Sequence, residues 1–210
     1  LRRMKPENIY ELTQALALIR PGPTESGMKE ALLRRREGRH APQDSFMDKI
    51  LPETGGLLLY EEQVMQIAER IAGMAPEEGD LLRRSLKVKN VDTRLKERFF
   101  KEAKERGYAT AEITKLWKTM EEFSSYSFNK AHSASYANMA YQAVYLKAHH
   151  VVPYFAAVLN AGGGYYGLAE YIEEAKRSGI KILGPDVNRS FYQFEVEGRA
   201  IRVGLTSIKG

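Results

Sequence analysis

Three consecutive glycines, Gly162-Gly163-Gly164, separate two parts of the 210-residue chain that differ in the spacing of their apolar residues. Before the glycines, apolar residues recur every three or four positions, which is the period of amphipathic helices. After them, residues 191–203 alternate around a Glu197-Gly198 turn, as the strands of a β-hairpin do. We therefore expect a mainly α fold, with a multi-helix domain over residues 1–162 and a small C-terminal α/β extension over residues 163–210.

Prolines, glycines and capping residues indicate where the helices begin and end. Pro76 suits the first turn of a helix, and Asp92 and Thr110 suit the N-caps of two more. Asn129 is expected to cap one of the longest helices, from Lys130 to about His149. The other expected elements are helices over about 6–19, 60–73 and 168–178, a loop-rich stretch over 38–56, and a strand at 181–183.

Composition excludes several classes of protein. Apolar residues make up 43% of the chain, which is enough for a core and argues against disorder. Cysteine is absent, so disulfides, thiolate metal sites and cysteine nucleophiles are excluded. The sequence contains neither a run of about eighteen apolar residues nor the apolar core of a signal peptide. We expect a cytoplasmic protein without membrane contact. Because the chain begins with Leu rather than Met, we also expect it to be part of something longer.

Positive charge is concentrated in two stretches. The net charge is only +5, but residues 81–106 contain ten Lys and Arg against four acidic residues. A second cluster, Arg34-Arg35-Arg36 with Arg39, lies upstream. Such surpluses attract polyanions, and phosphate is a common one. The alternative for each stretch is a solvated helix face.

Motifs for metal and nucleotide-loop chemistry are missing. The sequence has no Asp-x-Asp, no Walker-type loop and no Gly-x-Gly-x-x-Gly. Glu61 and Glu62 are adjacent, so on a helix their side chains would point about 100° apart. His149-His150 lacks partner ligands at metal spacing and is expected to serve as a cation at a helix C-terminus. We therefore expect no metal site.

Two arginines on one helix are candidates for phosphate binding. Arg83 and Arg84 could project toward a shared anion, and guanidinium groups bind phosphate through two parallel hydrogen bonds. Asp80 lies four residues before Arg84, however. An ordinary salt bridge within the helix is therefore the alternative.

The stretch 128–136 (FNKAHSASY) is a second candidate. Asn129 and Lys130 lie at a helix N-terminus, where backbone amides favour an anion. His132 and Tyr136 are four residues apart and share one face, where they could contact a sugar and a base. The small residues between them leave room for a partner. The alternative is tight helix packing through those small residues, with Tyr136 buried.

Five blocks in order resemble the fingers domain of the bacterial DNA polymerase III alpha subunit, which belongs to the C family of DNA polymerases. They are 17–28 (ALIRPGPTESGM), 60–68 (YEEQVMQIA), 81–84 (LLRR), 128–149 (from FNKAHSASY to YLKAH), and 182–188 (ILGPDVN) with 203–210 (VGLTSIKG). The last block resembles the segment leading into a helix-hairpin-helix region. Two departures are Lys87-Val88-Lys89 where the family commonly has Gly-Lys-Lys, and Glu61 where it commonly has Gln.

The resemblance implies roles for particular residues. Those expected to bind the incoming deoxynucleoside triphosphate (dNTP) are Arg83, Arg84, Lys130, His132 and Tyr136. Those expected to bind DNA or phosphate are Arg20, Lys87, Lys89 and Asn129. His132 would lie near the sugar and help to exclude ribose. The reaction implied is attack of a 3′-hydroxyl on the α-phosphate, assisted by two Mg²⁺ ions.

The resemblance also implies partners. These are template-primer DNA, dNTPs, the palm and thumb of the same polymerase, and a sliding clamp reached through other regions. The Mg²⁺ would be held by palm aspartates, so these 210 residues alone should bind without polymerising, in a nucleoid-associated enzyme. The alternatives are a stand-alone nucleic-acid-binding helical module, and a helical domain whose basic surface binds an acidic protein.

Overall fold

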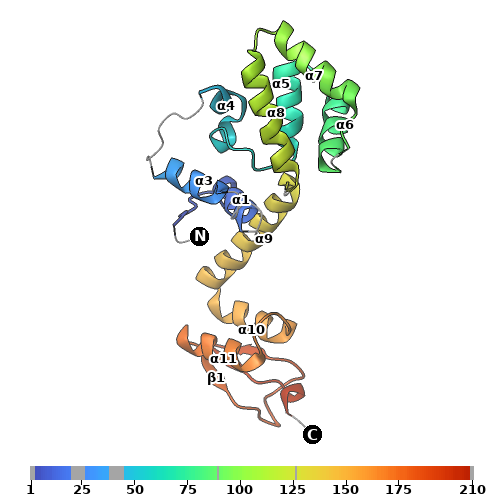
Figure 1. The fold of residues 1–210 in the computed structure, drawn as a ribbon. Coiled ribbons are helices and arrows are strands. Elements are labelled where there is room, and N and C mark those ends of the chain that lie inside the picture. Colours follow the sequence, from blue (N-terminus) through green and yellow to red (C-terminus); the bar gives the residue numbers. More distant parts are fainter. Residues whose placement is uncertain (1–2, 20–26, 38–44, 89, 126, 209–210) are drawn as a thin grey trace. The chain divides into compact units, whose positions relative to one another are not determined.

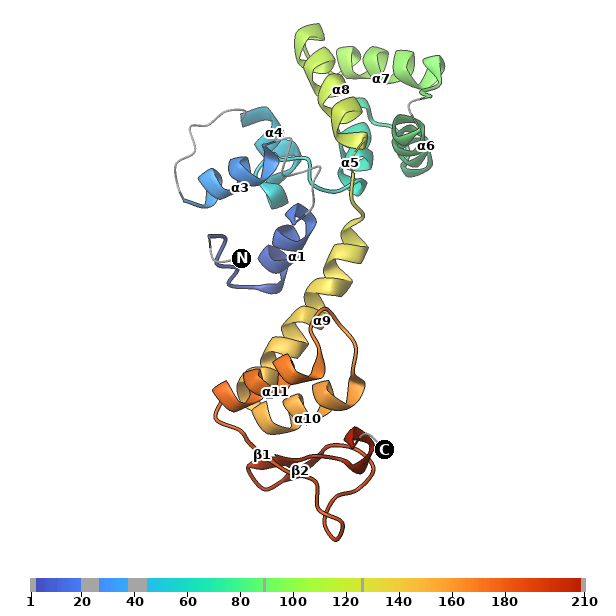
Figure 2. The ribbon, with the colours of Figure 1, turned by 60° about the horizontal axis from the view of Figure 1, so that its bottom comes forward.

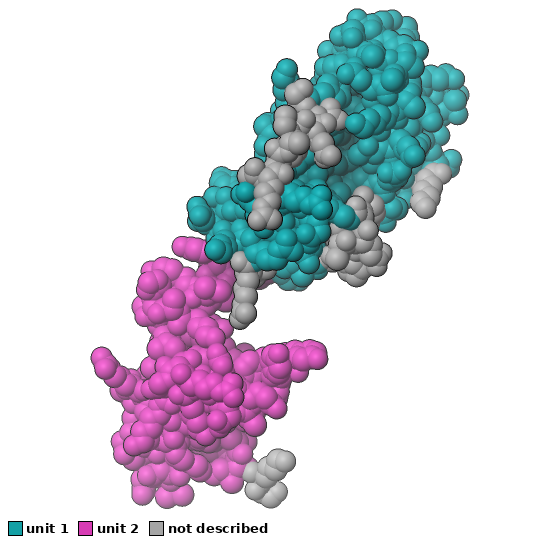
Figure 3. Space-filling model, turned by 60° about the vertical axis from the view of Figure 1, so that its left-hand side comes forward, with its two compact units in different colours: residues 1–138 teal, residues 139–210 magenta. Residues whose placement is uncertain are grey.

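The computed structural model describes residues 3–19, 27–37, 45–88, 90–125 and 127–208 (Figures 1 and 2). They form two compact units, residues 1–138 and 139–210, which Figure 3 colours separately. The first unit is helical and the second contains helices with a small sheet, so the expected fold class is confirmed. Over these ranges, no helix is both long enough and apolar enough to cross a membrane.

Many helix ends of the first unit lie where the sequence predicts them. The Asp92 side chain accepts the backbone N–H of Arg94 at the start of one helix, and Pro76 begins another. Gly73, with φ +60°, ends a third in the left-handed conformation that glycine adopts without strain. The helices are α1 (Ile9–Leu18), α3 (Met28–Arg36), α4 (Ser45–Ile50), α5 (Glu62–Ala72), α6 (Pro76–Lys87), α7 (Thr93–Glu105), α8 (Thr110–Ser124) and the first part of α9 (Lys130–His149).

Two local predictions are wrong. Thr110 is the first residue of α8 rather than its N-cap, and the carboxylate of Glu112 accepts the N–H of Ala109 at 3.0 Å instead. In its described part, the stretch expected to be loop-rich contains α4 and the 3₁₀ helix η1 (Pro52–Thr54). This segment is ordered because Ile50 and Leu51 are buried in the core.

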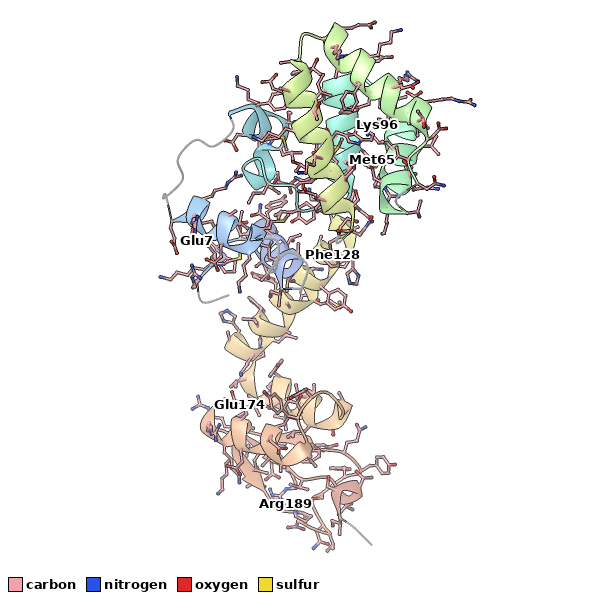
Figure 4. All side chains as sticks on the ribbon, viewed as in Figure 1. Glu7, Met65, Lys96, Phe128, Glu174 and Arg189 are labelled. Carbon is pink, nitrogen blue, oxygen red and sulfur yellow. The ribbon has the colours of Figure 1, made fainter. Side chains whose placement is uncertain are left out.

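The main core of the first unit lies among α5, α6, α7 and α8 (Figure 1). Ile67 and Ile71 of α5 are completely buried there. The α5–α6 contact is close: a Cβ at Gly79 would lie 3.4 Å from the Cα of Met65, which is labelled in Figure 4. On the other side of the core, the ring of Trp117 packs 5.4 Å from that of Phe99.

A second core joins α1 and α3 to the segment just before α5. Leu59 and Tyr60 are buried against these helices. The first turns of α9 are anchored to α1, since the Ser133 hydroxyl donates to the carbonyl of Thr13 at 2.6 Å. Ala137, one turn later, is also fully buried. The start of α9 is therefore fixed through small side chains.

The second unit contains the rest of α9 followed by α10 (Val151–Ala161) and α11 (Leu168–Arg177), which lie against a three-stranded sheet (Figure 2). The strands are β1 (Lys181–Leu183), β2 (Glu195–Glu197) and β3 (Ala200–Arg202), in the order β1-β3-β2. β2 and β3 pair antiparallel, which confirms the expected hairpin, and β1 pairs parallel to β3. The 3₁₀ helix η2 (Leu205–Ser207) follows.

The division between the units falls within α9 at 138/139, whereas the sequence led us to expect it at 162/163. The reason is the packing of α10. Phe155 and Leu159 of this helix are buried with Ile201 of the sheet. The Asn160 amide group also exchanges two 2.8 Å hydrogen bonds with the backbone of Phe194. The glycine run is therefore a connection inside the second unit.

A buried glutamine fixes the segment that enters α5. Gln63 is almost completely buried, and its Oε1 accepts the backbone N–H groups of Leu59 at 2.6 Å and Tyr60 at 2.9 Å. Its Nε2 donates to the Thr54 hydroxyl at 2.8 Å. Because buried amide groups without partners are costly, these bonds determine how the chain turns before Glu61.

We predict that Gln63→Ala destabilises the protein by about 2–4 kcal/mol, since two buried N–H groups lose their acceptor at once. The free energy of unfolding is measured by urea denaturation monitored by circular dichroism. Gln66→Ala, one turn along the same helix and only half-buried, is the matched control and should change the free energy of unfolding much less. Equal losses in the two variants would contradict this account of the segment.

Candidate functional site

The carboxylate of Glu61 lies where residues from three segments meet. Its side chain comes from the start of α5 and the residue is only 8% exposed. Arg83 Nη1 and Lys87 Nζ, both from α6, donate to Oε2 at 2.9 and 3.1 Å. Asn129 Nδ2, at the start of α9, donates to Oε1 at 3.4 Å. A single acidic group therefore joins α6 to the beginning of α9.

Asp80 is a second carboxylate beside Arg83, and it also pairs with Arg84. Its Oδ1 accepts from Nε and Nη2 of Arg83 at 2.9 and 2.7 Å, and its Oδ2 lies 2.6 Å from Nη2 of Arg84. The salt bridge within the helix that we held as an alternative is therefore present. The anion that the two arginines share here is Asp80 of the protein itself, and phosphate binding by them stays a prediction.

We call the three positive side chains of α6 the cationic cluster: Arg83, Arg84 and Lys87. Their three positive charges exceed the two negative charges of Glu61 and Asp80 by one. The side chain of Arg83 is only 19% exposed, because Glu61 and Asp80 enclose it. Those of Arg84 and Lys87 are 69% and 54% exposed. An external anion would therefore meet Arg84 and Lys87 first.

The charge state of Glu61 follows from these contacts. Burial would raise the pKa of its carboxyl group. The hydrogen bond from Lys87, the charges of Arg83 and Lys87 and the bond from Asn129 outweigh burial, so the pKa is lowered. The hydrogen bonds from Arg83 likewise lower the pKa of Asp80. Both groups are ionised at neutral pH.

Glu62 turns toward α9 rather than α6. Its two carboxylate oxygens each accept the backbone N–H of Lys130 at 3.0 Å. Asn129 Oδ1 accepts the N–H of His132 at 2.9 Å, which confirms Asn129 as the N-cap. We expected the first amides of α9 to be open to a phosphate, but these two already have acceptors. A negative charge is favourable at a helix N-terminus, and Glu62 supplies it.

The side chain of Lys130 also has a partner. Its Nζ lies 2.7 Å from the carboxylate of Glu53 and 5.7 Å from the centroid of the Tyr60 ring. The ammonium group is therefore held at the edge of the buried segment that precedes α5. A ligand that binds Lys130 would have to share it with Glu53.

Aromatic rings line one side of the first turns of α9. The ring of His132 lies 4.6 Å from that of Tyr136 and 5.4 Å from that of Phe128, which is labelled in Figure 4. His132 is exposed and Tyr136 is 53% exposed, so the alternative with Tyr136 buried is wrong. The small residues Ser133 and Ala137 pack on a different face. The helix thus combines tight packing on one side with an open aromatic side.

The structure brings together most of the residues singled out in the sequence. Arg83, Lys87 and Asn129 meet at Glu61, and Arg84 joins them through Asp80. His132 and Tyr136 follow directly along α9. Arg20 and Lys89 lie outside the described residues. Sequence reasoning missed Glu61 as the centre, although the 100° divergence from Glu62 already indicated that the two carboxylates serve different neighbours.

In the described part of the chain, no three His, Asp or Glu side chains are grouped as a metal ion requires. The ring of His149, at the end of α9, instead contacts that of Tyr145, with the two centroids 4.4 Å apart. The two carboxylates of the cluster are occupied by cationic side chains. These residues therefore do not form a Mg²⁺ site, and the Mg²⁺ ions that the resemblance implies would have to be held by residues elsewhere.

We predict that the Glu61 contacts stabilise the fold in a pH-dependent way. A carboxyl group with a lowered pKa contributes stability that is complete above its ordinary value of 4.5 and is lost as the pH falls through the folded-state value. The loss of stability caused by Glu61→Gln should therefore be largest near neutral pH and shrink below pH 4.5. Urea unfolding of both proteins at a series of pH values measures it, and a pH-independent difference would contradict it.

Comparison with known proteins places the chain in a family. The profile described as "Bacterial DNA polymerase III alpha subunit finger domain" matches residues 1–107, just over half of the chain. A profile described as "Helix-hairpin-helix motif" matches residues 179–210, whose described part contains β1, β2, β3 and η2. The second match therefore covers the strand-rich end of the chain.

Curated relatives match over the full length. The proteins named "DNA polymerase III subunit alpha" from Aquifex aeolicus, Thermus aquaticus and Escherichia coli K12 are 38%, 39% and 36% identical over 100% of this chain. The match covers only 18%, 18% and 19% of those relatives, so the chain spans about a fifth of their length. The chain belongs to the bacterial DNA polymerase III alpha subunit finger-domain family.

Proposed function

We propose that this chain is the fingers part of a bacterial DNA-directed DNA polymerase and binds the incoming dNTP and the template-primer. The observation that carries the proposal is the position of Asn129. Its Nδ2 donates to Glu61 at the cationic cluster, while its Oδ1 caps the helix that carries His132. The cationic cluster, which suits phosphate, and His132, which suits a sugar or base, are therefore connected through the hydrogen bonds of Asn129.

The cationic cluster would bind phosphate. Arg84 and Lys87 are largely exposed and retain N–H groups that no described residue accepts, because Arg carries five such groups and Lys three. Arg83 is held in place behind them. Charge-assisted hydrogen bonds from such groups to phosphate are among the stronger polar contacts in proteins. A triphosphate, or the phosphates of nearby DNA, is the expected ligand.

The aromatic side of α9 would meet the nascent base pair. The rings of His132 and Tyr136 are exposed and lie next to each other with their centroids 4.6 Å apart, and stacking on a base or sugar needs only an open ring face. Lys130 lies at the same helix start. His132 would lie near the sugar and disfavour a 2′-hydroxyl. Arg20 and Lys89 remain candidates for DNA contact.

The chemistry proposed for the complete polymerase is attack of a primer 3′-hydroxyl on the α-phosphate, with release of pyrophosphate. The residues described here would position phosphate and base. Mg²⁺ would be held by carboxylates of a palm domain, and residues 1–210 alone would not polymerise. Contact with palm and thumb, with a sliding clamp through other regions, and a cytoplasmic, nucleoid-associated location belong to the same proposal. The direct test is primer extension by the protein that the complete gene encodes.

We predict that Arg84→Ala raises the KM for dNTP at least several-fold, since one charge-assisted contact to phosphate is lost. The measurement is steady-state primer extension. Arg94→Ala removes another exposed arginine, one without a described ion pair, and is the control, with no change in KM expected. Arg83→Ala should act in the same direction. An unchanged KM for both Arg83→Ala and Arg84→Ala would remove the phosphate assignment.

We predict that His132→Ala relaxes discrimination against ribonucleotides, because the imidazole would no longer occupy space beside the sugar. The ratio of kcat/KM for a deoxynucleotide to that for the matching ribonucleotide measures it. His149→Ala is a close control, since His149 is also exposed and its ring contacts that of a tyrosine four residues away. An intact ratio in His132→Ala would leave His132 as a packing residue.

A further inference from the structure

Glu61 differs from the other groups of the site because it opposes the charge that a phosphate ligand needs. It is a nearly buried carboxylate, and two of the three cations in the cationic cluster donate to the same oxygen, Oε2. Such a group can hold cations in position. It also competes with any external anion for their N–H groups.

The competition between Glu61 and an external anion affects binding because the cationic cluster has little net positive charge. The cationic cluster has three positive groups, and Glu61 and Asp80 cancel two of them. Arg83 donates one N–H to Glu61 and two to Asp80, so three of its five N–H groups have carboxylate acceptors. Removing one carboxylate charge would double the net positive charge of the cluster, from one unit to two.

Geometry indicates that Gln at position 61 would preserve the local structure. The backbone N–H of Glu61 donates to the carbonyl of Phe128 at 2.9 Å, a bond that does not depend on the side chain. The Gln63 contacts also fix the preceding segment independently. A glutamine amide oxygen can still accept from Arg83. Substitution by Gln would therefore change mainly the charge.

We propose that Glu61 is a positioning residue that restrains Arg83 and Lys87 and weakens phosphate binding at the cationic cluster. This inference rests on the proposed function, because it assumes that the cluster meets the triphosphate. Glu61 keeps both cations directed toward the start of α9 and lowers the attraction for phosphate, so a bound triphosphate, and the pyrophosphate that leaves, are held less tightly. Nucleotide affinity is thus set by a carboxylate that does not itself touch the nucleotide.

The test compares charge-removing variants of the protein as its complete gene encodes it. In Glu61→Gln, the KM for dNTP should fall by about threefold or more. Inhibition by inorganic tripolyphosphate and by pyrophosphate should strengthen in parallel, while kcat does not rise. Asp80→Asn makes the same charge change at a more exposed carboxylate and should shift the KM in the same direction. Glu77→Gln, an exposed acidic residue in the first turn of α6, is the matched control.

The outcomes separate the two proposals. If Arg84→Ala raises the KM but neither Glu61→Gln nor Asp80→Asn lowers it, the restraint is overturned and the phosphate assignment stands. If neither Arg83→Ala nor Arg84→Ala changes the KM, the assignment of phosphate binding to the cationic cluster is wrong, and the proposal for Glu61 is wrong with it. A raised KM in Glu61→Gln would overturn the restraint and mark Glu61 as structural only. A lowered KM with strengthened tripolyphosphate inhibition, without the same effect in Glu77→Gln, would support the restraint.

Discussion

The contact on which the rest of the site depends is the hydrogen bonding of one buried carboxylate, that of Glu61, to groups from α6 and from the start of α9. A buried charge is costly unless it is paired, and here Arg83 and Lys87 pair it while Asn129 completes its contacts. Removal of Arg83 or Lys87 would leave the buried carboxylate of Glu61 with fewer partners and so incur part of this cost. The positions of α6 and of the beginning of α9 are therefore coupled energetically.

Glu61 and Glu62 are adjacent in the sequence, but their carboxylates contact different helices. Successive residues at a helix start point about 100° apart, so one carboxylate reaches the cations of α6 and the other caps α9 at Lys130. The end of the site suited to phosphate and the end suited to a base thus share two neighbouring residues. The Gln63 bonds hold both in place, since they fix the backbone just before them.

Much of the fold could be predicted from local signals. Pro76, Asp92 and Gly73 mark helix ends through constraints that act within a few residues, and the structure has the ends where these residues lie. Thr110 misled because a glutamate three residues after the N-cap position satisfies the helix start equally well. The compact units divide within α9 and not at the glycine run, and glycines mark a turn without revealing which core the preceding helix joins.

The amino-acid sequence sufficed for the fold class, most of the helices, the hairpin, the family and the basic and capping residues that meet at Glu61, because these follow from periodicity, capping chemistry and ordered motifs, but not for Glu61 itself. Only the tertiary structure decided how these residues are used. It turned Arg83 inward and left Arg84 exposed, filled two amides at the start of α9 with protein acceptors, and separated the packed face of α9 from the face of His132 and Tyr136. The physical reason is that ion pairing and burial depend on residues distant in sequence, here as far apart as Glu61 and Asn129, which no local pattern relates.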